Sequence, residues 1–99
     1  MQVWFLYIIE NKYQHYYTGI CKNLQKRYAE HQSSGLKCAK ALRGKGPLTM
    51  IYCCQLDSHS HALKMELWLK KLTKAQKRQF VTGALPCPHN YFTLATPPL

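Results

Sequence analysis

Hydrophobic positions along this chain form three short runs that predict strands. Residues 3–9 are almost all apolar, with β-branched and aromatic side chains, which is typical of a buried strand. Asn11 and Lys12 interrupt this run, and a second aromatic run follows over residues 13–20. Two such runs separated by a short polar break favour a β-hairpin. Residues 48–55, LTMIYCCQ, predict a third short buried strand.

The length of the hairpin loop decides which side chains share a face of the sheet. A three-residue loop over residues 11–13 would pair Glu10 with Gln14 and place Tyr7 opposite Tyr17 on one face. A two-residue loop would send the two phenols to opposite faces, because side chains alternate along a strand. We expect the three-residue loop.

The spacing of apolar residues changes to that of a helix after the second run. Asn23 is a good N-cap, and Leu24, Arg27, Tyr28 and His31 follow with the spacing of one helical face. Arg27 and His31 therefore lie one turn apart on the same side of this helix. Their side chains can converge with the two phenols of the hairpin.

Two more helices are predicted after the third strand. Ser58 or Ser60 can cap a helix that runs to about Leu72. The core-facing stripe of this helix consists of Ala62, Met65, Leu69 and Leu72. Thr73 can cap a last, basic amphipathic helix that ends near Gly83.

Length and pattern together predict one domain. A chain of 99 residues is long enough for one modest core and too short for two. We expect a domain over residues 1–83 and an irregular tail over residues 84–99. The expected fold class is α/β, with a small, mainly antiparallel three-stranded sheet flanked by helices.

The charge of the chain adds a class of partner to this picture. Its net charge is +10, from 14 Lys and Arg against 4 Asp and Glu, which favours a polyanion, nucleic acid before a membrane. A basic protein with no nucleic-acid role is the alternative. Residues 32–47 are equally well interpreted as a solvated connection or as a phosphate contact. The candidate DNA-binding residues are Lys22, Lys26, Lys37, Lys40, Arg43 and Lys45.

The cysteines and the apolar runs favour an intracellular protein. The five cysteines form no CxxC pair and leave an odd one, residues 3–9 are too short for a signal peptide, and no run approaches the length of a membrane span. We expect a cytoplasmic protein with free, mostly structural thiols and no membrane partner. A zinc cluster is disfavoured because no usual finger spacing is matched by Cys53, Cys54, His59 and His61.

Several short motifs, taken in order, resemble the signature of GIY-YIG endonucleases. They are FLY at residues 5–7, YTG at 17–19 and R-x-x-x-H at 27–31, and the segments GPLTMIY and ALKMELWLKKL extend the likeness over about residues 3–80. The chain resembles the small standalone YhbQ-like group, and also the N-terminal nuclease module of excision repair. The resemblance implies a metal-dependent DNA endonuclease that hydrolyses phosphodiester bonds by direct water attack, with structured or damaged DNA in repair or recombination as candidate substrates.

The same resemblance assigns roles to particular residues. Tyr7 and Tyr17 become the general base and its helper, in an order that stays open, and Arg27 stabilises the transition state. Glu66 becomes the ligand of one Mg²⁺ or Mn²⁺ ion that keeps most of its waters. Ordinary alternatives exist, since strand tyrosines usually pack and Glu66 can form a salt bridge with Lys70.

His31 is expected to compensate for a missing lysine. Relatives of the excision-repair branch carry a lysine directly after the glycine of the second motif, where this chain has Ile20. His31 can replace it as a hydrogen-bond partner of a phenol or a phosphate, or it can be a structural helix histidine. We expect Glu30 to point away from the Arg27 and His31 side, although a surface ion pair between Arg27 and Glu30 is the alternative role for that arginine.

Two other functions fit the sequence. The first is a catalytically inactive, basic nucleic-acid-binding domain. The second is a protein-interaction module that uses the surface of Trp4, Trp68 and the tyrosines. Asn90 is the only late candidate for an asparagine that sometimes completes the family's site, and we assign it no role because it falls in the predicted tail.

Overall fold

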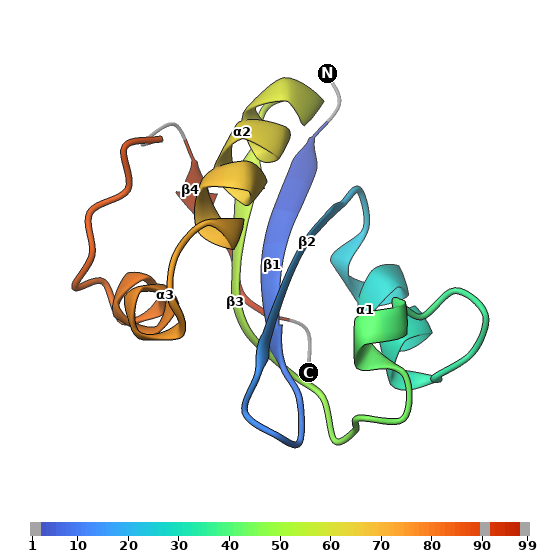
Figure 1. Cartoon of the computed structure of the whole chain (residues 1–99). Coiled ribbons are helices and arrows are strands. Elements are labelled where there is room, and N and C mark those ends of the chain that lie inside the picture. Colours follow the sequence, from blue (N-terminus) through green and yellow to red (C-terminus); the bar gives the residue numbers. More distant parts are fainter. Residues whose placement is uncertain (1–2, 90–91, 98–99) are drawn as a thin grey trace.

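An antiparallel sheet with helices on both faces forms the domain (Figure 1). The computed structural model describes residues 3–89 and 92–97. The strands, in the spatial order β2-β1-β3-β4, are Trp4–Glu10 (β1), Tyr16–Cys21 (β2), Thr49–Leu56 (β3) and Thr93–Leu94 (β4). The helices are Leu24–Gln32 (α1), the 3₁₀ helix Lys40–Leu42 (η1), His59–Lys70 (α2) and Lys74–Val81 (α3).

The fold is the predicted α/β class with one strand more than expected. β4 lies in the segment predicted to be an irregular tail, and it pairs with β3 through Cys54↔Leu94 and Gln55↔Thr93. A strand of two residues is too short to show any alternation, so the hydrophobic pattern could not predict it. Asn90 lies outside the described residues.

The predicted register of the hairpin is wrong. Its loop spans residues 11–15, and Glu10 pairs with Tyr16 instead of Gln14. The physical reason is a turn built by Asn11, whose buried side-chain oxygen accepts two backbone N–H groups of the loop at 2.9 and 3.1 Å. Gln14 adopts φ 62 within this turn.

The two phenols nevertheless share a face of the sheet. Tyr7 lies opposite Gly19, and Tyr17 lies opposite Ile9. The loop is longer than predicted by two residues, and a shift of two preserves the side on which each side chain lies. Tyr7 and Tyr17 are therefore diagonal neighbours instead of a directly opposed pair.

The predicted helix caps are confirmed. The side chain of Asn23 accepts a backbone N–H at 3.0 Å at the start of α1. Ser58 caps α2 in the same way at 3.1 Å, which decides between it and Ser60. Thr73 and Gln76 form a reciprocal capping box at the start of α3.

Alternation along β1 divides the core into two clusters on opposite faces of the sheet. On one face, β1 and β3 pack against α2 and α3, and the buried residues are Leu6, Ile8, Tyr52, Cys54, Leu56, Ala62, Met65, Leu69 and Phe80. The other face packs against α1 and η1 with Tyr7, Ile9, Cys21, Cys38, Leu42, Leu48, Met50 and Cys53. Leu72, predicted to end the α2 stripe, is only half-buried and follows the helix.

The adjacent Cys53 and Cys54 point to opposite faces of β3, and all five cysteines are free thiols. Within residues 3–89 and 92–97, no three His, Cys, Asp or Glu side chains gather closely enough to hold a metal ion. None of the described helices combines the length and the apolar character needed to span a bilayer.

Candidate active site

Tyr7 occupies the middle of β1 on the α1 face, and its side chain is 1 % exposed. Its ring lies directly over Gly19 of the neighbouring strand. A Cβ atom added at Gly19 would lie 2.5 Å from Tyr7 Oη, which is closer than any side chain tolerates. A glycine is therefore required at this point of β2, because only a bare backbone leaves room for the phenol.

His31 lies in the last turn of α1, fully buried against Tyr7. Its Nε2 is 2.8 Å from Tyr7 Oη, and its Nδ1 accepts the backbone N–H of Ala39 at 3.3 Å. Because Nδ1 is an acceptor, the neutral ring carries its proton on Nε2 and donates it to the phenol oxygen. Burial, reinforced by the nearby Arg27, lowers the pKa of His31 to about 4, so the imidazole is neutral at neutral pH.

Arg27 lies one turn before His31 and reaches the same phenol. Burial raises the pKa of Tyr7 well above its ordinary value, and a hydrogen bond from Arg27 partly opposes this rise. Arg27 Nη1 also donates to the carbonyl oxygen of Lys37 at 2.7 Å and to Glu30 Oε1 at 3.1 Å. The phenol is therefore protonated at neutral pH, with cationic and imidazole donors beside its oxygen.

The prediction that Glu30 points away from Arg27 is wrong. The two side chains form an ion pair across one helical turn, because the long arginine reaches a residue three positions later. This pairing lowers the pKa of Glu30, and Lys37 Nζ lies 3.9 Å from the other carboxylate oxygen. The ion pair and the contact with Tyr7 coexist, since a guanidinium has five N–H donors.

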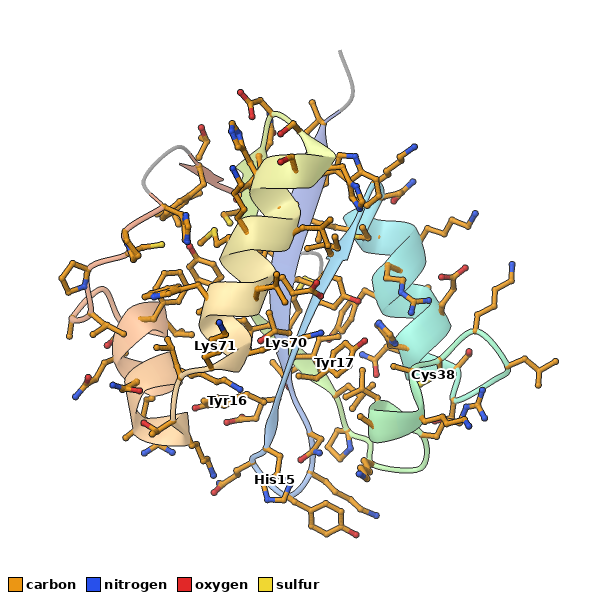
Figure 2. All side chains as sticks on the ribbon, turned by 45° about the horizontal axis from the view of Figure 1, so that its top comes forward. His15, Tyr16, Tyr17, Cys38, Lys70 and Lys71 are labelled. Carbon is orange, nitrogen blue, oxygen red and sulfur yellow. The ribbon has the colours of Figure 1, made fainter. Side chains whose placement is uncertain are left out.

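Tyr17 completes the cluster from the edge strand β2. Its ring centroid lies 6.3 Å from that of Tyr7 and 5.6 Å from that of His31, which it meets edge-on. Its side chain is half-buried, so it is the more accessible of the two phenols. Figure 2 shows Tyr17 on the edge strand, between α1 and α2.

Glu66 lies on the other side of the sheet, in the middle of α2, a helix that contacts β2 and β1. Its side chain is 14 % exposed, and its Oε2 lies 3.4 Å from Lys70 Nζ, so the alternative ion pair is present. Among the described residues, no hydrogen bond or ion pair joins Glu66 to Tyr7, Tyr17 or Arg27. The structure therefore brings four of the five predicted catalytic residues into one cluster and places the fifth on α2.

The predicted DNA-binding cations separate into two groups. Lys22 and Lys26 line a surface hollow of about 230 Å³ beside Arg27, at the start of α1. The others lie in the loop after α1, where Arg43 donates to the backbone carbonyls of two loop residues at 3.2 and 2.9 Å. Arg43 therefore holds the loop together, while the remaining cations of that loop are Lys37, Lys40 and Lys45.

The ion pair between Arg27 and Glu30 is the alternative that the sequence left open for that arginine. Two other features of the cluster were not assigned from the sequence. One is the close approach at Gly19, of which a glycine inside a strand pattern is a known sign. The other, the backbone N–H of Ala39 that fixes the tautomer of His31, carries no sequence signal, because every residue except proline has such a group.

Comparisons with known proteins find a matching family model and similar sequences. The GIY-YIG catalytic domain matches residues 3–79. A "UPF0213 protein" of Cronobacter sakazakii is 47 % identical over 85 residues, 86 % of this chain and 87 % of that protein. The "UPF0213 protein YhbQ" of Escherichia coli K12 is 41 % identical over 97 residues, 98 % of this chain and 95 % of that protein.

A solved structure has the same fold. The solution NMR structure of a UPF0213 protein from Bacillus halodurans superimposes with a TM-score of 0.54 at 31 % sequence identity. The alignment covers 81 % of this chain and 83 % of the other.

Proposed function

The chain belongs to the GIY-YIG catalytic domain family, a family of nucleases, and from this membership we propose that it is a DNA endonuclease that hydrolyses phosphodiester bonds by direct attack of water. Structured or damaged DNA, as in repair or recombination, is the proposed substrate class. The strongly basic composition of the chain supports a nucleic-acid substrate.

One observation carries this proposal: a buried phenol oxygen that faces a neutral imidazole at 2.8 Å and a guanidinium donor. An ordinary packed tyrosine needs one hydrogen-bond partner, and a purely structural site has no reason to gather two donors of this kind. Donors at a phenol oxygen favour the phenolate, and here they oppose in part the rise that burial causes in the pKa of Tyr7. Tyr7 is a phenol at neutral pH, so it must first lose its own proton before it can accept one from water.

The proposed chemistry uses the cluster as follows. Tyr7 or Tyr17, once its own proton has passed to solvent, accepts a proton from the water that attacks phosphorus, and the other tyrosine positions the phosphate. His31 holds Tyr7 in place through Nε2–H. Arg27 donates to the phosphate oxygens on which negative charge grows, and the bond to the leaving DNA oxygen breaks as the bond from water forms. Glu30 keeps the guanidinium oriented.

A divalent cation fits this chain only as a loosely held ion. Glu66 is a half-buried carboxylate, and within residues 3–89 and 92–97 no group of three or more metal-ligating side chains accompanies it. We propose that Glu66 is the protein ligand of a Mg²⁺ or Mn²⁺ ion whose other ligands are water and phosphate oxygens. Bound there, the ion would supply Lewis-acid stabilisation of the phosphate.

A cleavage assay tests the proposal. Wild-type protein, Glu66→Ala and the matched control Asp57→Asn are incubated with linear, nicked, flapped and branched DNA in Mg²⁺, Mn²⁺ or EDTA. Asp57 is an exposed acid next to His61, so its loss should leave cleavage intact. We expect metal-dependent cleavage that Glu66→Ala abolishes. Cleavage in EDTA, or equal rates in both variants, would contradict the role of Glu66.

The same experiment separates the alternatives. Salt-sensitive binding without cleavage on any substrate would favour an inactive nucleic-acid-binding domain. Negligible affinity for DNA at low salt would point to a protein-interaction module. Single-turnover cleavage in H₂¹⁸O tests direct water attack, which predicts one ¹⁸O atom in the product phosphate and no covalent protein–DNA adduct.

A further inference from the structure

Cations also gather around Tyr16, the residue next to Tyr17 on the edge strand. Arg78 Nε of α3 donates to Tyr16 Oη at 3.4 Å, and this contact raises the pKa of Arg78. Lys74 Nζ, at the start of the same helix, lies 6.0 Å from the centroid of the Tyr16 ring. The capping box at Thr73 fixes where α3 begins, so these cations are held beside the strand by a preformed helix.

The end of α2 adds two lysines to the same place. Lys70 and Lys71 are exposed and close the helix, directly before the short connection to α3. Figure 2 shows both of them on the side of the molecule where Tyr16 and Tyr17 of the edge strand are seen. We call Lys70, Lys71, Lys74, Arg78 and Tyr16 the α2–α3 corner.

Acidic residues offset only part of this charge. Glu66 pairs with Lys70, and Glu10, which lies opposite Tyr16 in the hairpin, raises the pKa of Arg78. α3 itself contains no acid. Among the described residues, no carboxylate lies within ion-pair distance of Lys71 or Lys74. These two lysines are therefore available to an external anion.

The corner faces a second group of cations across the edge strand. Lys26 and Arg27 line the hollow on the α1 side, whereas Lys22 Nζ lies 5.3 Å from the centroid of the Trp4 ring, and Trp4 packs with α2 on the opposite face of the sheet. The two groups thus lie on opposite faces of the sheet near its β2 edge. Cations on both faces of one sheet edge can contact the two phosphate backbones that border a groove of a duplex.

We propose that the α2–α3 corner binds the phosphate backbone of one strand of duplex DNA while the α1-side cations bind that of the other. This inference rests on the proposed function for the identity of the ligand. It adds a binding surface made by residues outside the candidate set Lys22–Lys45, and it commits to a double-stranded substrate at the point of cleavage.

Binding measured without cleavage tests this proposal. Fluorescence anisotropy in EDTA gives the association constant of a 20-bp duplex and of one of its strands over a range of salt concentrations. The variants are Lys74→Gln, Lys71→Gln and the control Gln79→Glu, which lowers the net charge equally but lies away from the Tyr16 side of α3. Circular dichroism confirms that each variant is folded, and the Lys71 and Lys74 variants provide two independent tests of the corner.

We expect each lysine variant to reduce the slope of log K against log salt by about 0.9 for the duplex, with the single strand and the control unchanged. The proposal would be overturned if the lysine variants and Gln79→Glu changed the salt slope for the duplex equally. It would also be overturned if the lysine variants lowered the slope equally for single-stranded DNA. Duplex binding that depends on the corner, without any cleavage in metal, would contradict the nuclease and leave the binding surface standing. Cleavage in metal, with no effect of these variants on duplex binding, would support the nuclease and contradict the α2–α3 corner as a binding surface.

Discussion

The two faces of β1 differ in chemistry although they alternate along one strand. Leu6 and Ile8 point to the α2 and α3 face, where the buried cluster is built almost wholly from apolar side chains. Tyr7 points to the α1 face, where it meets His31 and Arg27. Both faces therefore bury apolar side chains, and the α1 face in addition buries a hydrogen-bonded pair of polar groups, Tyr7 and His31.

This difference shows how a small domain can hold a reactive cluster. Burying His31 and the Tyr7 hydroxyl without partners would be costly, and each satisfies the other at 2.8 Å. The apolar clusters on both faces supply the stability that allows this arrangement. Substitutions on the two faces should consequently have different effects, one on activity and the other on folding.

The largest effect is expected from Arg27→Ala. Removing the guanidinium takes away a donor to the developing charge on the phosphate, and we expect the single-turnover cleavage rate to fall about 10²- to 10³-fold. The side chain is 29 % exposed, so the fold should survive. Arg27→Lys tests the forked geometry, because a lysine keeps the charge without the two parallel donors. Cleavage at the wild-type rate in Arg27→Ala would remove the chemical role of the α1 face.

The matching change on the other face is Met65→Ala. Met65 is fully buried in α2, and its truncation should lower the free energy of unfolding by about 2–5 kcal/mol. Urea denaturation measures this loss. We expect the cleavage rate per folded molecule to stay close to that of the wild type. A rate that falls as far as in Arg27→Ala would show that the two faces are not functionally separate.

Lowering the pH should reduce the free energy of unfolding, because His31 is buried as a neutral imidazole on the α1 face. Its pKa is about 4 in the folded protein and near 6.5 when unfolded, so the unfolded chain binds more protons between these values. The free energy of unfolding should therefore fall as pH drops from about 6.5 to about 4, by at most about 3 kcal/mol. His31→Gln should lose this part of the pH dependence in urea titrations. An identical pH profile in the variant would contradict a buried, neutral His31.

A smaller effect is expected from Gly19→Ala. The new methyl group would meet Tyr7 Oη at 2.5 Å, so the phenol must move away from His31. We expect a loss of about 1–3 kcal/mol in stability together with reduced cleavage. Gly35→Ala is the control, because its nearest neighbour is Ser33 Oγ at 3.3 Å in an exposed loop. NMR signals of His31 that do not shift in Gly19→Ala would refute the close contact.

The fold could be predicted where a pattern extends over several residues. Three strands, three helices and their caps follow from hydrophobic spacing and from Asn23, Ser58 and Thr73. The hairpin register could not be predicted from this spacing. It depends on the side chain of Asn11, which builds a local turn that competes with strand pairing. β4 is set by pairing with β3, a long-range contact that its two residues do not encode.

The site was predictable in its residue types more than in its contacts. Helical spacing placed Arg27 and His31 on one side of α1, and strand alternation placed Tyr7 and Tyr17 on one face. The prediction for Glu30 was wrong because spacing within a helix gives the direction of a Cα–Cβ bond. It does not show how far the long Arg27 side chain can extend toward Glu30. The roles of Glu66 and of the lysines depend on substrate and metal, so they stay predictions.

Single-turnover cleavage by Tyr7→Phe tests the role of the α1 face most directly. Phenylalanine keeps the ring packed over Gly19 and removes only the oxygen that meets His31. Normalised to the folded fraction and measured on bound DNA in Mg²⁺, the rate should fall at least about 100-fold, while affinity for the same duplex in EDTA stays that of the wild type. Cleavage by Tyr7→Phe at the wild-type rate would show that this phenol only packs and would contradict its part in breaking the bond.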